Sequence, residues 1–137
     1  MSINYPPTSW LRIKEDFNEI ISEIQDGFYE QGYKNKIIIF YDFSKLKCRE
    51  KITNGVMELF QYDYYDENFN ILMKFHSEPH EEEEYQTDTE PFHMHVNQDA
   101  DDLACSFRTE LYKPHQDLEG IIKFIRGHHI ISGKLYV

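Results

Sequence analysis

The sequence predicts an α+β protein in which an antiparallel β-meander sheet is packed on one face by an N-terminal and a C-terminal helix. Three observations support this fold class: an apolar stripe at helical spacing near the N-terminus, a middle region of β-branched and aromatic runs broken by turn residues, and a second helical stripe near the C-terminus. The chain of 137 residues has the usual length of one domain, so we expect a single domain spanning residues 1–137.

The first helix is predicted from the spacing of apolar residues after Pro6 and Pro7. Thr8 or Ser9 fits the N-cap position, and Gly32 fits the end of the helix. Intervals of three and four place seven residues on one stripe of an amphipathic helix, which we interpret as core: Trp10, Ile13, Phe17, Ile20, Ile21, Ile24 and Phe28.

Four strands are predicted between Lys36 and His76, where β-branched and aromatic residues predominate. The dipeptide Asn54-Gly55 is typical of a two-residue hairpin turn, and residues 66–70 indicate a second turn. Strands joined by such short links pair antiparallel with their neighbours. The expected strands are Lys36 to Asp42, Leu46 to Ile52, Val56 to Tyr65 and Ile71 to His76.

A second helix is predicted after Pro114, with Gly127 as its end. Its apolar face consists of Leu118, Ile121, Ile122 and Ile125. The tail from Ile130 to Val137 fits a short additional strand. His115 at the helix start, and His128 and His129 after the helix end, are interpreted as ordinary terminal residues.

The negative charge of the chain is concentrated in one segment. The net charge is −11, yet ten acidic residues and no Lys or Arg lie between Phe75 and Phe107, so the remainder of the chain is nearly balanced. A mimic of nucleic acid would instead spread its charge over a whole face. The one basic patch, which would have to hold any bound nucleic acid, alternates along a predicted strand and is most simply a solvated face: Lys45, Lys47, Arg49 and Lys51.

The cysteines and the N-terminus predict a cytoplasmic protein. Cys48 and Cys105 form no C-x-x-C motif, and two free thiols fit a reducing compartment. The first ten residues lack the charged and apolar regions of a signal peptide, and the longest aliphatic run is Ile37 to Phe40. We therefore expect no association with a membrane.

The segment from His76 to His95 contains the residues best suited to catalysis or metal binding. In the motif Phe92-His93-Met94-His95, alternation along a strand places both histidines on one face. The strand ending at His76 shows the same alternation, with Lys74 on its polar face. If both strands turn their apolar faces to the core, as register requires, then His76, His93 and His95 converge on the other side. His80, in the connecting loop, can join them.

Two kinds of chemistry fit this histidine cluster. Neutral imidazoles of His76, His93 and His95 can bind zinc or another divalent ion, with Glu81, Glu83 or Asp88 as a further ligand or general base. Alternatively, two histidines in different protonation states can act as general base and general acid in phosphodiester or acyl chemistry. The residues leave both readings open, and a polar surface without chemistry remains the simplest competitor.

The order of residues from Tyr62 to His95 resembles the TumE-type toxin family of prokaryotic toxin–antitoxin modules. The resemblance is carried by Tyr62-x-Tyr64-Tyr65-Asp66, an aliphatic strand ending Lys74-Phe75-His76, Pro79-His80, and Phe92-His93-x-His95. Glu81, Lys74 and the direct sequence Phe92-His93 depart from the family pattern, which has His, Arg and an intervening Pro at these points. The resemblance implies a small cytoplasmic protein encoded beside a helix-turn-helix antitoxin.

Two functional hypotheses follow. The first is a TumE-like toxin, acting on RNA, with the site at His76, His80, His93 and His95 and with Tyr64 and Lys74 beside it. The second is a non-enzymatic acidic interaction or inhibitor protein, for example phage-encoded, that presents its acidic segment to a basic partner surface. A third use of the histidines, a metal site with a purely structural role, accompanies either hypothesis.

Overall fold

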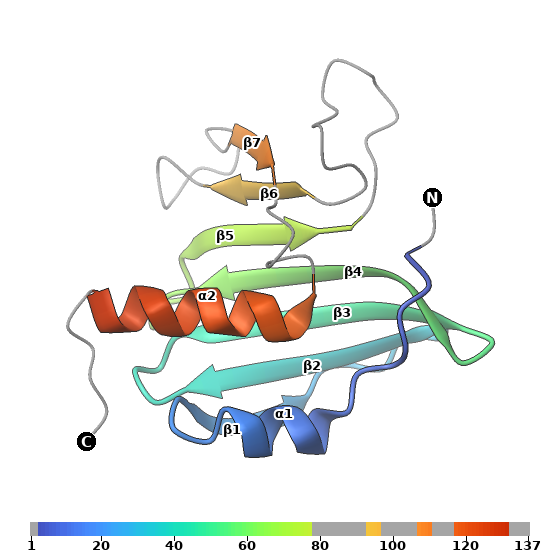
Figure 1. Ribbon diagram of the computed structural model, residues 1–137, viewed down its shortest axis with the longest axis horizontal. Helices are drawn as coiled ribbons and strands as arrows, with labels where there is room; N and C mark the ends of the chain where they lie inside the picture. The colour runs from blue at the N-terminus through green and yellow to red at the C-terminus, as the bar shows by residue number, and fades with distance from the viewer. Residues whose placement is uncertain (1–2, 78–92, 97–106, 111–116, 132–137) are drawn as a thin grey trace.

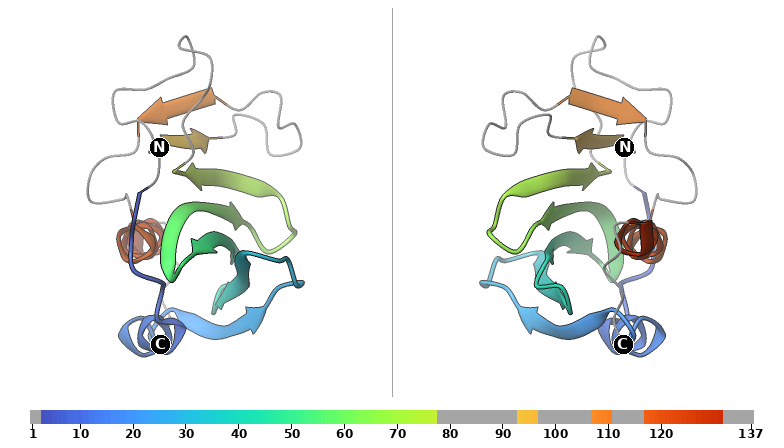
Figure 2. Two further views of the ribbon diagram at one scale, coloured as in Figure 1. Left: turned by 90° about the vertical axis from the view of Figure 1, so that its right-hand side faces the viewer. Right: turned by 90° about the vertical axis from the view of Figure 1, so that its left-hand side faces the viewer.

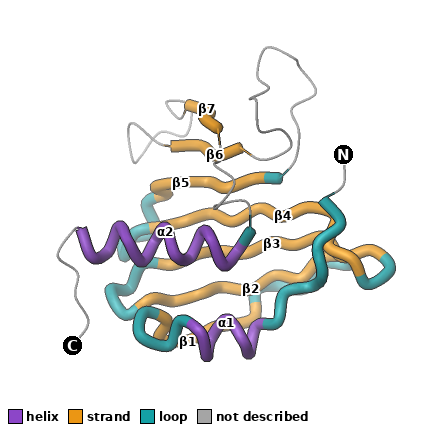
Figure 3. The backbone as a smooth tube through the Cα atoms, in the orientation of Figure 1, coloured by secondary structure: helices purple, strands orange, loops and turns teal. Residues whose placement is uncertain are grey.

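The computed structural model describes residues 3–77, 93–96, 107–110 and 117–131. Each strand pairs antiparallel with the next one along the chain, so the strands form a single seven-stranded sheet in the order β1 to β7 (Figures 1 and 3). This confirms the predicted meander. The elements are α1 (Trp10–Asp16), β1 (Ile21–Asp26), β2 (Tyr33–Phe40), β3 (Lys45–Thr53), β4 (Val56–Tyr65), β5 (Ile71–His76), β6 (His93–Val96), β7 (Phe107–Glu110) and α2 (Leu118–Ile131).

The predicted turns between the central strands are confirmed. Asn54 and Gly55 both adopt positive φ angles, 53° and 76°, which is the conformation of a type I′ hairpin turn. In the turn between β4 and β5, the Asp66 side chain accepts hydrogen bonds from the backbone N–H groups of Asn68 and Asn70. β4 and β5 have the predicted bounds, β2 begins three residues earlier and ends two residues earlier than predicted, and β3 is one residue longer at each end.

The prediction of one long N-terminal helix is wrong. α1 ends at Asp16, and the chain then turns so that Ile21–Asp26 forms β1 and pairs with β2. β-branched residues at 20, 21 and 24 favour a strand, and pairing with β2 gives the backbone of β1 its hydrogen bonds. Gly32 lies at the start of β2 with φ +81° and does not end a helix, and Phe28 is exposed.

The predicted end of the C-terminal helix is also wrong. α2 continues through Gly127 to Ile131, so Ile130 and Ile131 belong to the helix and not to a strand, and residues 132–137 lie outside the described part. The apolar face was predicted correctly, since Leu118, Ile121, Ile122 and Ile125 are all buried. Neither described helix is long and apolar enough to cross a membrane.

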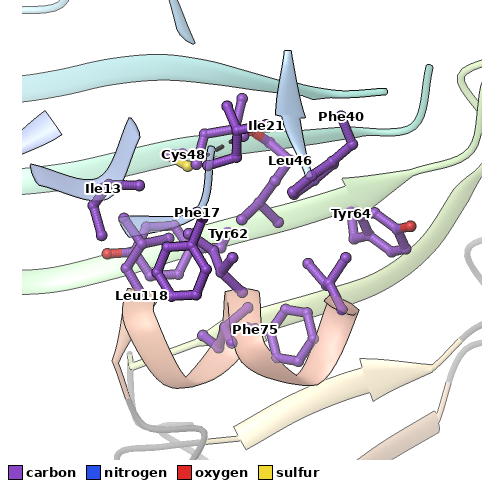
Figure 4. Packing of buried hydrophobic residues seen from close by; sticks show 14 of the residues in the cluster. Ile13, Phe17, Ile21, Phe40, Leu46, Cys48, Tyr62, Tyr64, Phe75 and Leu118 are labelled. Carbon is purple, nitrogen blue, oxygen red and sulfur yellow. Dashed lines mark hydrogen bonds between the residues drawn. The ribbon is translucent and has the colours of Figure 1, made fainter. Parts of the chain in front are cut away.

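Both helices lie on the same side of the sheet, which makes two layers (Figure 2). The core fills the space between them, and Figure 4 shows apolar side chains of the strands facing those of α1 and α2. Full burial of each such side chain contributes about 1.5–3 kcal/mol relative to exposure. Fully buried members from the sheet and the helices include Ile21, Ile38, Phe40, Leu46, Cys48, Phe60, Tyr62, Phe75, Ile121 and Ile122.

Candidate functional site

The sheet face opposite α1 and α2, hereafter the outer face, carries the polar residues of the central strands. Along β3, buried Leu46, Cys48 and Glu50 alternate with side chains that point the other way. The same alternation on β4 and β5 places Tyr62, Tyr64 and Phe75 in the core, whereas the other side carries polar residues together with the apolar side chains of Tyr65 and Leu72. The outer face of β3 to β5 thus includes Lys45, Lys47, Arg49, Lys51, Gln61, Asp63, Lys74 and His76.

The centre of the outer face is a pair formed by His76 and Asp63. The His76 Nε2 atom is buried and lies 3.9 Å from Asp63 Oδ1, which is longer than a hydrogen bond but within ion-pair distance when the ring is protonated. Asp63 is only 8% exposed and also accepts a hydrogen bond from Gln61 Nε2 at 3.2 Å. A carboxylate directed at one nitrogen of a histidine orients the ring for proton transfer at the other nitrogen.

Strand pairing brings the predicted histidine positions together. β5 and β6 are adjacent and antiparallel, with His76 opposite His93 and Lys74 opposite His95. The pairing of β4 with β5 places Asp63 opposite Lys74 and Gln61 opposite His76. Directly opposed positions of an antiparallel ladder share a face, so the pairing of these two strands agrees with the predicted register.

Several predicted site residues lie outside the described part of the chain. His80 and the acidic candidates Glu81, Glu83 and Asp88 belong to this group, and β6 is described for its backbone alone. Among the residues that the structure describes, no three His, Cys, Asp or Glu side chains gather as a metal site would require. The zinc or other divalent-metal site of His76, His93 and His95 therefore stays a prediction.

Tyr64 lies on the core side of the sheet and not with His76. Its hydroxyl is 2.7 Å from His129 Nε2 and donates to Ser44 Oγ at 3.1 Å. His129, interpreted from the sequence as an ordinary terminal residue, is 1% exposed and its Nε2 lies 3.3 Å from Asp42 Oδ2. The structure thus separates two polar clusters: His76 with Asp63 on the outer face, and His129 with Tyr64 in the core.

Asp63 and His129 were both missed in the sequence, although each has a recognisable signal. Asp63 interrupts a run of tyrosines in β4 and stands opposite Lys74 once β4 and β5 are paired. His129 lies four residues after Ile125 on α2, which is the helical spacing of the buried stripe. That spacing was hidden because the helix was expected to end at Gly127.

A recessed region lies on the helix side of the sheet. A cleft of about 450 Å³ is bordered by Thr8, Arg12, Tyr62 and Asp117, among other residues. Behind it, Glu50 is 1% exposed and accepts hydrogen bonds from Tyr62 Oη at 2.5 Å and Thr8 Oγ1 at 2.7 Å. Burial raises the pKa of Glu50, and the two hydrogen bonds offset part of this effect.

The comparison with models of protein families finds a match for this chain. Residues 8–129, which are most of the chain, match the model of a protein family described as Toxin TumE. No curated protein and no solved structure matches the chain. The family match extends well beyond the motifs from Tyr62 to His95 and includes both polar clusters.

Proposed function

The chain belongs to the TumE toxin family, and from this premise we propose that it is the toxin of a prokaryotic toxin–antitoxin module and acts on RNA. The observation that carries the action on RNA is the His76–Asp63 pair on the outer face, with Lys74 opposite Asp63 in the strand register. A histidine oriented by a carboxylate and flanked by a cation suits proton transfer next to a phosphate group.

The proposed reaction is transfer of the phosphodiester to the neighbouring 2′-hydroxyl. His76 accepts the proton of the 2′-hydroxyl as its oxygen bonds to phosphorus, and Lys74 stabilises the negative charge on the phosphate oxygens. The bond from phosphorus to the 5′-oxygen breaks, and His93, which stands opposite His76 in the strand register, donates a proton to that leaving oxygen. The products are a 2′,3′-cyclic phosphate and a 5′-hydroxyl, so no proton or electron is left unbalanced.

Inducible expression tests this function. The wild type should arrest growth and shorten cellular RNA, whereas His76→Ala and His93→Ala should not, because loss of a general base or acid lowers a rate by roughly 10²- to 10⁴-fold. His128→Ala is the matched control, since His128 is exposed on α2, away from the outer face, and should leave the arrest unchanged. RNA ends from the purified protein should carry cyclic phosphate. Arrest that persists in both histidine variants would contradict the proposal.

The proposed partner is an antitoxin, which the family implies in general, and the helix-turn-helix type is part of the proposal. Coexpression of this antitoxin should restore growth.

The alternative function, an acidic interaction or inhibitor protein, is favoured by the ten acidic residues between Phe75 and Phe107. That function predicts binding to a basic partner which weakens steeply with salt and survives both histidine substitutions.

A further inference from the structure

The outer face of the central strands carries an excess of positive charge in a chain whose net charge is −11. On β3, β4 and β5 its cations are Lys45, Lys47, Arg49, Lys51 and Lys74, and two of them, Lys47 and Lys74, stand directly opposite Asp63 in the strand register. Two of these cations are neutralised locally. Arg49 binds Glu30 through two hydrogen bonds of 3.0 and 2.9 Å, and Lys51 lies 3.4 Å from Glu58.

The other three cations have no carboxylate at ion-pair distance among the residues that the structure describes. Lys47 is exposed on β3. Lys74 lies on β5, directly opposite Asp63 of β4. Lys45 donates to the carbonyl oxygen of Phe43 at 2.9 Å, which is a neutral acceptor. Unpaired lysines on one sheet face can neutralise the phosphates of a bound strand.

Two exposed aromatic rings accompany these lysines. The Lys45 ammonium lies 4.1 Å from the centre of the Phe69 ring, and the Lys47 ammonium lies 5.7 Å from that of Phe28. Phe69 is 67% exposed and Phe28 is 65% exposed, so both retain surface for a further contact. Cations beside exposed aromatic rings match the two needs of single-stranded nucleic acid, which are neutralised phosphates and stacked bases.

We propose that the outer face binds single-stranded RNA, with phosphates at Lys47 and Lys74 and bases stacked on Phe28 and Phe69. The proposal rests on the proposed function for its choice of RNA and deepens it by naming how the substrate is held. A strand bound along Lys47, Asp63 and Lys74 passes His76, whose ring contacts the same Asp63. A duplex fits less well because its bases are stacked on one another and cannot reach the two rings.

Fluorescence anisotropy with a short labelled 2′-O-methyl oligouridine tests the surface, because this probe lacks the 2′-hydroxyl and cannot be cleaved. The Lys47→Ala/Lys74→Ala variant should bind more weakly and lower the slope of log affinity against log salt by about 1.4, the value for two phosphate contacts on a single strand. The Lys34→Ala/Lys123→Ala variant removes equal charge from β2 and α2 and should bind like the wild type.

The contribution of the two aromatic rings to RNA binding is tested with separate substitutions and a matched control. Phe28→Ala and Phe69→Ala should each weaken binding by roughly 5-fold to 150-fold, the range for the loss of one stacked base. Tyr29→Ala removes a ring that is 89% exposed and adjacent to Phe28, and it should leave the affinity unchanged. Equal losses in the test and control variants would overturn the proposal.

Three further outcomes would also overturn it: no binding of the probe, tighter binding of duplex RNA, or competition by polyglutamate as effective as competition by RNA. The last outcome would assign the surface to an acidic protein segment.

Failure of this binding surface can be distinguished from failure of the proposed function. If the probe does not bind but growth arrest depends on His76, the binding surface is wrong and the function stands. If the probe binds as expected but growth arrest does not depend on His76, the binding surface stands and the proposed function is wrong.

Discussion

At the scale of single residues, the structure uses its buried polar groups in two different ways. On the outer face, Asp63 lies 3.9 Å from one nitrogen of His76, whose side chain is 19% exposed. In the core, His129 joins Tyr64 and Asp42 under full burial, where no substrate reaches it. The first arrangement suits chemistry, whereas the second connects the end of α2 to the turn between β2 and β3 and suits stability.

His129 should therefore contribute strongly to stability. His129→Ala removes the ring nitrogen that Tyr64 Oη and Asp42 approach and opens a cavity, so we expect the free energy of unfolding to fall by roughly 2–4 kcal/mol. His128→Ala, one residue earlier and exposed, should change it by no more than about 0.5 kcal/mol. Urea denaturation measures both. Similar values for the two variants would show that the core cluster contributes little.

Glu50 should make stability depend on pH. Its pKa in the folded protein is raised above the ordinary value of 4.5, mainly by burial, so the folded state binds the proton more tightly than the unfolded chain. This contribution is fully present below that value and is lost as pH rises through the folded pKa. Glu50→Gln, which stays neutral, should have a higher melting temperature than the wild type at neutral pH and a similar one in acid.

Exposed Glu15 on α1 provides the control for this comparison. Glu15→Gln should leave the pH profile of the melting temperature unchanged. A Glu50→Gln profile parallel to that of the wild type would contradict the role assigned to burial.

At the scale of elements, tertiary contacts decided which of two local structures formed. The stripe from Trp10 to Phe28 fits helical spacing, but its second half pairs with β2 as β1. α1 alone has seven residues, fewer than an isolated helix needs in water, so packing of Ile13 against the core holds it in place. α2 shows the opposite case, because packing of its C-terminal part, where His129 is buried, extends the helix past Gly127.

Gly127 is therefore a site for stabilisation. A Cβ atom added there meets nothing within 4 Å, so Gly127→Ala should raise the free energy of unfolding by about 0.8–1 kcal/mol through helix propensity alone. A Cβ at Gly32 also meets nothing, but this residue has φ +81°, so Gly32→Ala should lower the same quantity by roughly 1–2 kcal/mol. Denaturation curves for the two variants should shift in opposite directions, and shifts in one direction would refute this reading.

At the scale of the whole molecule, the meander separates two faces with different roles. α1 and α2 cover one face and bury the apolar side chains of the strands (Figure 2). The outer face collects the polar side chains of β3 to β5, with an excess of cations in a chain that is strongly acidic as a whole. An acidic protein can thus present a local cationic surface, since screening in salt confines each charge to its neighbourhood.

The sequence by itself determined the central strands, their turns, their order and the face to which Lys74 and His76 belong. Alternation has a period of two and the dipeptide Asn54-Gly55 is typical of a two-residue turn, so local pattern was enough for these features. Tertiary structure alone decided that residues 21–26 form a strand, that α2 passes Gly127, and that Asp63 meets His76 while Tyr64 meets His129. These choices depend on partners distant in the sequence, and a local pattern carries no information about them.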